Sequence, residues 1–277
     1  MKKTLLFALL CLVLLPCEAL AWGGRNHATV TYIAERHLTE RAKANIGKYI
    51  DHRSITYYAA WMDYNRTEPP FDVTHGWHVD YWTDDLRQDK DGNPVPPASL
   101  SAIERIIEEL SDFRSAPDSL VNINIRFLAH MIGDMHCPVH IDFPKTHGVD
   151  LRIRGRKSTS FHKLWDGVMI DIAQPGFSPK DYALMLDTLS PEEVARRQQG
   201  TPADWFKESL KSTEKAMKLI PGGGEIVAGK NNRRKMVVPD DGLSHTNYFF
   251  AATDVANEQI LNSGLRLAAV LNKIFDK

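Results

Sequence analysis

The sequence predicts an all-α protein, a single mainly helical domain with one or two short β-hairpins. Apolar residues recur at helical spacing over most of the chain, which is typical of helices with one buried face. Two short stretches depart from this pattern: residues 149–154 alternate like a strand, and 224–238 resembles a hairpin around 230–232. There is no internal repeat, and the three glycines at 222–224 are interpreted as a loop within one domain.

Residues 26–38 are predicted to form the first helix, because apolar residues such as Val30 and Ile33 fall on one face of it. Thr39 can then cap a second helix, which is expected to end near Ile50.

The segment 101–113 places its isoleucines on one face and its glutamates outside, as expected for a helix on the surface of a core. Residues 119–136 (SLVNINIRFLAHMIGDMH) are predicted to form a buried helix. Pro138 must end or kink that helix, because proline has no N–H and clashes with the preceding turn. Further helices are expected over 161–173, 203–219 and 247–275.

Residues 1–21 are typical of a secretory signal peptide, with two lysines, an apolar run over 5–15 and Ala-Leu-Ala at 19–21. Cleavage of the Ala21–Trp22 bond would leave 22–277 as the mature protein, secreted or periplasmic. No second apolar run approaches the length of a membrane span, so no span is expected after cleavage.

A lipoprotein anchored through Cys17 is the weaker alternative, because Pro16 occupies a place where a small residue is expected. Cys11 and Cys17 would leave with the signal, and Cys137 would have no partner for a disulfide within the chain. The formal net charge is −1, so overall charge does not mark a nucleic-acid binder, and any anion site must be local.

The spacing of histidines and aspartates points to metal binding. His130 and Asp134 are four residues apart on the predicted buried helix, so both project from one face. His162 and Asp166 repeat this spacing, and His140 follows Pro138, where the chain can turn back toward the same cavity. Such pairs are costly to bury unless a shared dication satisfies them. All these ligands are nitrogen or oxygen donors without cysteine, and zinc is the metal that best fits a hydrolytic site.

Trp22 adds a second kind of ligand. The α-amine that signal cleavage would create, together with the carbonyl oxygen of Trp22, can chelate a metal in a five-membered ring. His27, five residues further on, could complete that site.

With these residues in view, the chain resembles the secreted single-strand-specific zinc nucleases and 3′-nucleotidases of fungi, plants and bacteria. Zinc-dependent phospholipase C is their structural relative. The resemblance covers most of the predicted mature chain. It rests on WGGRNHATVTYIAE (22–35), AWMDYNR (60–66), GWHVDYW (76–82), FLAHMIGDMHCPVH (127–140), FHKLWD (161–166) and NEQILNSGLRLAAVLN (257–272).

The resemblance implies three zinc ions, two of which are bridged by Asp134. The three ligand sets it implies are Asp63, His78, His130 and Asp134; Trp22, His27 and Asp134; and His140, His162 and Asp166.

The same resemblance implies hydrolysis of single-stranded DNA and RNA to 5′-phosphate products, together with 3′-nucleotidase activity. A zinc-bridged hydroxide is expected to attack phosphorus in line. Asp63 would orient that nucleophile, and Arg66 would contact the scissile phosphate and stabilise its equatorial oxygens. The enzyme is expected to act as a monomer.

Several positions depart from the family pattern. Asp150 stands where an asparagine helps to bind phosphate, so we expect it near the substrate although its charge would repel a phosphate. Val79 replaces an aromatic residue that stacks on the base in fungal members; Tyr81 or Trp82 could substitute, and a core position fits either equally well. Cys137 replaces a glutamine.

These departures leave two other functions open. One is another phosphoesterase on the same scaffold, such as a phospholipase C acting on lipid head groups. Asp166 and Arg66 favour the nuclease branch over it, because the lipase relatives carry a glutamate at the place of Asp166. The other is a zinc-stabilised binding protein without turnover.

Overall fold

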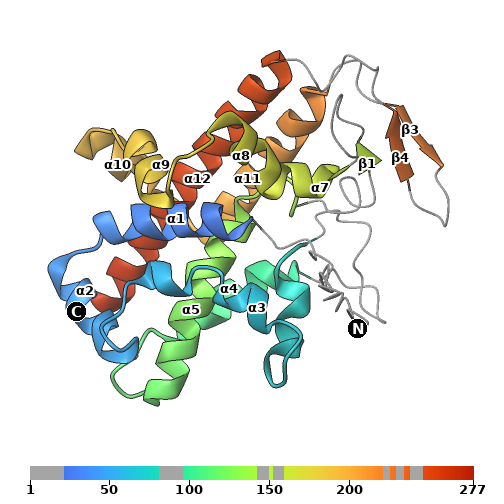
Figure 1. Cartoon of the computed structure of the whole chain (residues 1–277). Helices are drawn as coiled ribbons and strands as arrows, with labels where there is room; N and C mark the ends of the chain where they lie inside the picture. The colour runs from blue at the N-terminus through green and yellow to red at the C-terminus, as the bar shows by residue number, and fades with distance from the viewer. Residues whose placement is uncertain are drawn as a thin grey trace, which may run out of the picture.

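The computed structural model describes residues 22–80, 96–141, 150–151, 159–220, 225–228, 234–237 and 246–277. The described chain is all-α, as the sequence predicts, with two short strand pairs at one edge (Figure 1). Its α-helices are α1 (Gly24–Arg36), α2 (Glu40–Tyr49), α3 (Trp61–Asn65), α4 (Ala98–Glu109), α5 (Asp118–Met135), α7 (Phe161–Lys163), α8 (Met169–Ala173), α9 (Pro179–Leu186), α10 (Pro191–Arg197), α11 (Pro202–Lys218) and α12 (Thr246–Phe275). The 3-10 helices η1 (Ile55–Tyr58) and η2 (Phe71–Trp77) and the π-helical turn η3 (Leu164–Val168) complete the set.

The helices agree with the apolar pattern, and side-chain hydrogen bonds explain where α2 and α4 begin. The Thr39 side chain accepts the N–H of Ala42 and caps α2, as predicted. Helix α4 begins at Ala98, three residues before the predicted start. There the Asp80 carboxylate accepts hydrogen bonds from both the N–H and the hydroxyl of Ser99, at 2.7 and 3.0 Å. The earlier start could not be predicted from the local sequence, because Asp80 lies 19 residues before Ser99.

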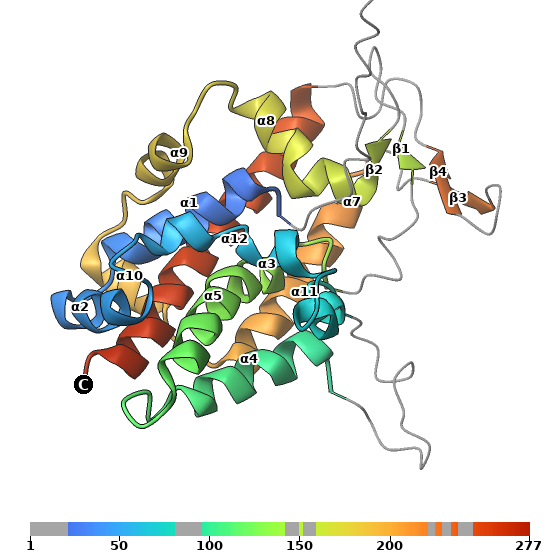
Figure 2. The ribbon, with the colours of Figure 1, turned by 60° about the horizontal axis from the view of Figure 1, so that its bottom comes forward.

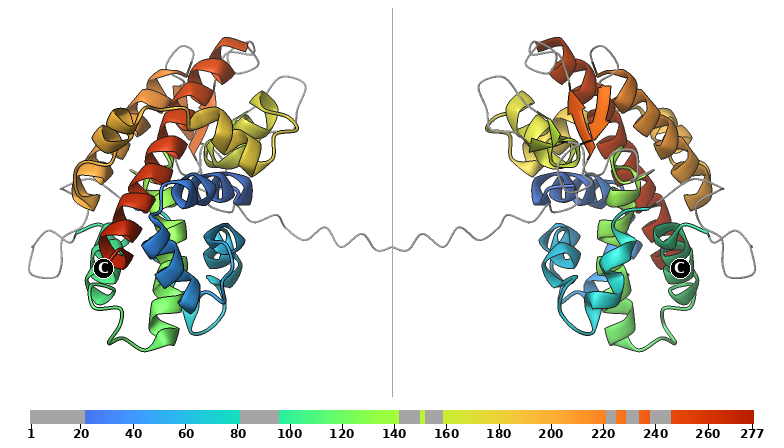
Figure 3. Two further views of the ribbon diagram at one scale, coloured as in Figure 1. Left: turned by 90° about the vertical axis from the view of Figure 1, so that its left-hand side faces the viewer. Right: turned by 90° about the vertical axis from the view of Figure 1, so that its right-hand side faces the viewer.

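Helix α12 forms the centre of the bundle. It contacts α1, α2, α5, α8, α9, α10 and α11, and Figure 3 shows it crossing most of the height of the molecule. Gly264 lets α1 approach closely, because a Cβ at this position would lie 2.6 Å from the Cβ of Ile33 and 2.8 Å from the carbonyl oxygen of Val30. The core is therefore organised around the α1–α12 crossing.

Helix α5 is the second buried axis and packs against α2, α3, α4 and α12 (Figure 2). Its last ten residues from Arg126 onward are buried almost without interruption, and they include His130 and Asp134. The helix ends at Met135, two residues before the Cys137–Pro138 bond, as the proline predicts. Two ionisable side chains thus lie inside an apolar helix, which requires something to satisfy them.

The strands form one small sheet in the order β2-β1-β4-β3. Strands β1 (Asp150–Leu151) and β2 (Thr159–Ser160) are antiparallel, and so are β3 (Glu225–Ala228) and β4 (Arg234–Val237). The second pair confirms the hairpin predicted over 224–238. In the part of the chain that the structure covers, no helix is long and apolar enough to cross a membrane.

Candidate metal centre

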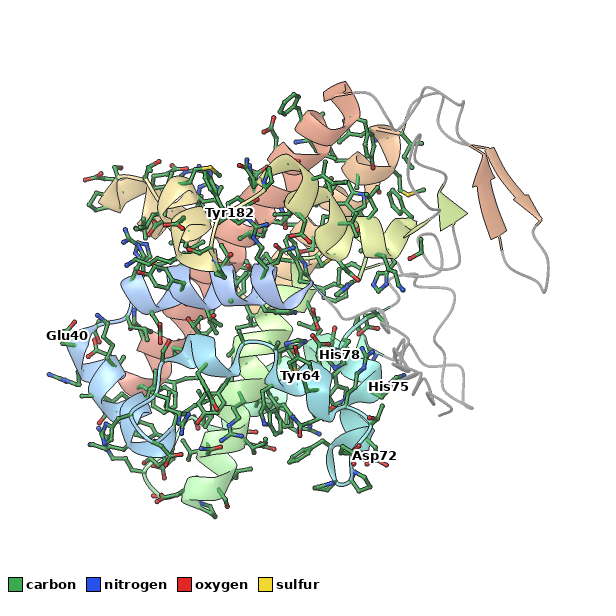
Figure 4. All side chains as sticks on the ribbon, viewed as in Figure 1. Glu40, Tyr64, Asp72, His75, His78 and Tyr182 are labelled. Carbon is green, nitrogen blue, oxygen red and sulfur yellow. The ribbon has the colours of Figure 1, made fainter. Side chains whose placement is uncertain are left out.

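Three helices and one 3-10 turn direct ionisable side chains to one point inside the protein. This group, named the Asp134 cluster, consists of His27 of α1, Asp63 of α3, His78 directly after η2, and His130 and Asp134 of α5. Each of the five is at most 4% exposed. Figure 4 shows His78 with Tyr64 of α3 on the same side of the molecule.

Asp134 lies at the middle of the cluster, and its two carboxylate oxygens face different partners. Oδ2 is 3.0 Å from His78 Nδ1 and 3.1 Å from His130 Nε2. Oδ1 is 3.2 Å from His27 Nε2 and 3.3 Å from His140 Nδ1. One carboxylate is therefore positioned to serve two neighbouring sites.

The first of these sites also includes Asp63. Its Oδ1 lies 3.6 Å from His78 Nδ1 and 3.7 Å from His130 Nε2, and these two nitrogens are 3.1 Å apart. Ligand atoms about 2.0–2.1 Å from a tetrahedral zinc are roughly 3.3 Å from one another. The distances in the cluster match that spacing.

Several buried polar atoms of the cluster have no hydrogen bond. They include both ring nitrogens of His27, both carboxylate oxygens of Asp63, and Asp134 Oδ1. An unsatisfied buried polar group typically costs about 1–3 kcal/mol, so their convergence fits a bound cation better than a dry core. His130 Nδ1 donates a hydrogen bond to the carbonyl oxygen of Ala59 at 2.8 Å, which leaves the lone pair of Nε2 facing the cluster.

Gly133 makes room for His27. A Cβ at residue 133 would lie 2.8 Å from His27 Nδ1, closer than real Cβ contacts allow. The start of α1 is held in place from the other side, where the Gly23 N–H and the Asn26 side-chain amide donate to the carbonyl oxygen of Asp166 at 2.6 and 2.8 Å. The imidazole of His27 stacks on that of His130, with ring centroids 3.8 Å apart.

A second group lies next to the first and is named the His140 cluster. It consists of Cys137, His140, His162 of α7 and Asp166 of η3. Asp166 Oδ1 is 3.1 Å from His140 Nε2, and Asp166 Oδ2 is 3.6 Å from His162 Nδ1. Because His140 Nδ1 also faces Asp134, the two clusters adjoin through this imidazole. Three groups of ligand atoms in the described residues could hold a metal ion: His27, Asp63 and His130; His78, His130 and Asp134; and Cys137, His140 and Asp166.

The similarity of the chain to known proteins agrees with this arrangement. The sequence profile of the S1/P1 nucleases matches residues 22–276. The chain belongs to the S1/P1 nuclease family. Endonuclease 4 of Arabidopsis thaliana is 25% identical, with 93% of this chain and 90% of its own length covered. Nuclease S1 of Aspergillus oryzae is 24% identical, with 91% of both chains covered, and nuclease P1 of Penicillium citrinum is 22% identical over 91% of this chain and 97% of its own.

Membership in the S1/P1 nuclease family makes this protein a hydrolase of phosphodiester bonds in nucleic acids. This confirms the resemblance to the family that the sequence analysis identified. Both clusters lie within the matched range, and their buried histidines and aspartates are the groups in the described chain that fit a metal-dependent nuclease.

The structure places Trp22 and Arg66 beside these clusters. Trp22 is buried, and the next residue, Gly23, donates its N–H to the carbonyl oxygen of Asp166. The backbone of Trp22 therefore lies next to the segment that carries Asp166. Arg66 follows α3, and its Nη1 lies 3.8 Å from Asp63 Oδ1. A guanidinium at this distance contributes positive charge at the edge of the Asp134 cluster.

The structure describes only some of the positions at which the sequence departs from the family pattern. The backbone of Asp150 pairs in β1 with Ser160, which caps α7 and so stands two residues before His162; the Asp150 side chain lies outside the described residues. Val79 is half-buried, and Tyr81 and Trp82, the possible stacking residues, fall outside the described part of the chain.

Burial and neighbouring charges shift the pKa values of the cluster. Burial lowers the pKa of His27 to about 3 and that of His78 to about 4, so both are neutral and able to donate a lone pair. Burial also raises the pKa of Asp63 to about 6. Burial alone would raise the pKa of Asp134, but the surrounding histidines, His130 and His140 above all, hold it well below its usual range.

Two residues of the HCPVH segment (136–140) have surroundings that the sequence did not show. Cys137, which the sequence interpretation left out of the metal ligands, lies beside His140 and Asp166, and burial raises the pKa of its thiol to about 11. His136 is fully buried. Its Nδ1 donates to the carbonyl oxygen of Ile132 at 2.7 Å, and its Nε2 accepts from Arg266 at 3.0 Å. The contact with Ile132, one helical turn earlier, could be predicted from the spacing in the sequence. The contact with Arg266 could not, because Arg266 belongs to α12.

Proposed function

We propose that this protein is a zinc-dependent phosphodiesterase that hydrolyses single-stranded DNA and RNA to 5′-phosphate products and also removes 3′ phosphates from nucleotides. The observation that carries the proposal is the placement of Asp134, whose two oxygens face separate sets of histidines. Family membership supplies the phosphodiester substrate. The shared carboxylate adds a reason why more than one metal would act there.

The donor sets fit three zinc ions. Nitrogen and carboxylate oxygen donors with tetrahedral spacing favour zinc over magnesium or calcium, which prefer oxygen donors only. The proposed sets are Asp63, His78, His130 and Asp134; Trp22, His27 and Asp134; and His140, His162 and Asp166. Zinc bound in such sites lowers the pKa of water and neutralises charge on a phosphate.

The protein's own residues would position the substrate. Arg66, at the edge of the Asp134 cluster, would donate to the non-bridging phosphate oxygens and stabilise their growing charge. Asp63 keeps an oxygen without a hydrogen bond inside the cluster, where it would orient the attacking water. The backbone of β1 places Asp150 near α7, and its carboxylate would contact a substrate hydroxyl in preference to the phosphate.

We further propose that residues 1–21 are removed as a signal peptide and that 22–277 is one secreted or periplasmic domain that acts as a monomer. Cleavage after Ala21 would free the α-amine of Trp22 for a metal. The family match begins at Trp22, which supports this boundary. Trp22 is buried and the Gly23 N–H donates to the carbonyl oxygen of Asp166, so the α-amine that cleavage would create would belong to a packed segment beside the His140 cluster.

The test incubates the zinc-loaded protein, without its signal, with single-stranded DNA, RNA, 3′-AMP and phosphatidylcholine. We expect cleavage of the first three substrates and 5′-phosphate ends on the fragments. Cleavage of the lipid alone would contradict the nuclease proposal. A full complement of zinc with no turnover of any substrate would favour a binding protein instead.

A further inference from the structure

Cys137 lies at the first residue of the turn that follows α5. Its N–H donates to the carbonyl oxygen of Asp134 at 2.9 Å, and its own carbonyl oxygen accepts the N–H of His140 at 3.0 Å. Cys137 and His140 thus belong to one hydrogen-bonded Cys-x-x-His turn with Pro138 inside it. Short spacings of this kind bring two donor side chains to the same metal in many zinc sites.

The thiol is directed at the His140 cluster. Cys137 Sγ lies 3.9 Å from Asp166 Oδ1, and His140 Nε2 lies 3.1 Å from the same oxygen. One donor atom from each of the three residues lies within 4.8 Å of the others. With zinc–sulfur and zinc–nitrogen distances of about 2.3 and 2.0 Å, a tetrahedral site needs separations of roughly 3.5 and 3.3 Å. The observed distances are within a few tenths of an ångström of these.

A second observation points to a ligand at the same place. Asp166 is 4% exposed, and its Oδ2 is buried without a hydrogen bond. His162 Nδ1, at 3.6 Å, is too far from this oxygen for a hydrogen bond. A cation between the thiol, the imidazole and the carboxylate would satisfy this oxygen.

We propose that Cys137 is a ligand of the metal bound by His140, His162 and Asp166, so that this site has sulfur, nitrogen and oxygen donors. The inference rests on the proposed function only in that a metal occupies this site. On binding, the Sγ–H bond breaks as the metal–sulfur bond forms, and the proton passes to water. A thiolate would make this site the softest of the three, with a stronger preference for zinc, cobalt and cadmium over magnesium and manganese.

Cobalt(II) substitution tests the assignment without measuring activity. The metal-free wild-type protein and Cys137→Ser are titrated with cobalt(II) and followed by absorption. The wild type should develop a near-ultraviolet thiolate-to-cobalt charge-transfer band, which nitrogen and oxygen ligands do not produce. Cys137→Ser should lack that band while keeping the visible cobalt bands of the other sites. It should also bind one equivalent of metal more weakly, by more than about 10-fold.

Zinc X-ray absorption on the wild type gives an independent answer if the variant does not fold. A sulfur neighbour at about 2.3 Å from zinc supports the proposal. Binding of metal with neither the sulfur neighbour nor the charge-transfer band would overturn the cysteine ligand and leave the nuclease proposal standing. Failure to bind any metal would overturn both.

Discussion

Asp134 Oδ1 lies 3.2 Å from His27 Nε2, although the two residues come from helices α5 and α1. The other oxygen of the same carboxylate faces His78 and His130. This relationship joins the first helix of the described chain to the buried axis of the fold. It makes the geometry at Asp134 depend on how closely α1 approaches α5.

Gly133→Ala should weaken metal binding without weakening the helix. The added methyl would meet His27 Nδ1 at 2.8 Å and push the imidazole away from Asp134. Alanine stabilises a helix relative to glycine by about 1 kcal/mol, so helix propensity by itself would make the variant more stable. We expect loss of about one zinc per chain, measured by elemental analysis.

Gly47→Ala is the matched control, because Gly47 also lies within a helix, α2, and its methyl would also meet an imidazole, that of His52, at 3.1 Å. His52 belongs to neither cluster, so this variant should keep all metals. Equal zinc content in Gly133→Ala and the wild type would show that His27 is not a ligand.

An extra residue before Trp22 should remove a metal. A peptide bond in place of the α-amine takes away its lone pair, while His27 and Asp134 remain. Protein beginning at Trp22 and protein with one added alanine are compared for zinc content and for cleavage of single-stranded DNA. We expect one zinc fewer and a rate lower by at least about 10-fold in the extended form. Identical values would exclude the amine as a ligand.

Arg66→Ala should lower kcat/KM for single-stranded DNA by about 100-fold, because a donor to the phosphate is lost. Arg66→Lys keeps the charge but not the planar pair of donors and should recover part of the rate. Zinc content should stay constant in both. Arg36→Ala, which removes a guanidinium paired with Asp187, serves as the control and should keep its rate. A rate for Arg66→Ala near that of the control would exclude phosphate contact.

His136 should make stability depend on pH. Burial, followed by the charge of Arg266, lowers its pKa to about 3, whereas an unfolded histidine has a pKa of about 6.5. Between these values the unfolded chain binds the extra proton, so the contribution of His136 to the free energy of unfolding falls as the pH drops below about 6.5 and is constant above it.

His136→Gln, which can still accept from Arg266, should reduce that slope. Melting temperatures of both proteins in excess zinc are compared at about pH 7.5 and about pH 5. The melting temperature of the wild type should fall more on acidification than that of the variant. Parallel losses would mean that His136 is protonated in the folded state.

The sequence was sufficient for features that depend on local spacing. The long helices, the Thr39 cap, the hairpin and the end of α5 follow from periodicity and from proline chemistry. The short helices α9 and α10 were missed, because eight and seven residues are too few for an apolar stripe, although Ser178 and Ser190 cap them.

The site depends more on contacts between distant segments. The pair His130 and Asp134 could be predicted from one helical turn, but its meeting with His27 could not be derived from spacing alone. The contacts that Cys137 and His136 make with distant residues could not be predicted from spacing either. Their surroundings are set by Asp166 and Arg266, which come from later parts of the chain.

The zinc content of Asp134→Asn is the most direct test of the shared-carboxylate account. An amide keeps one oxygen but loses the negative charge that two metals would share. The control is Asp187→Asn, another buried aspartate, whose two basic partners, Arg36 and His37, lie at the opposite end of α1 from His27. The account predicts that Asp134→Asn loses about two of three zinc ions, and with them at least about 1,000-fold in rate, while Asp187→Asn keeps all three. Full zinc content in Asp134→Asn, with an unchanged rate, would contradict it.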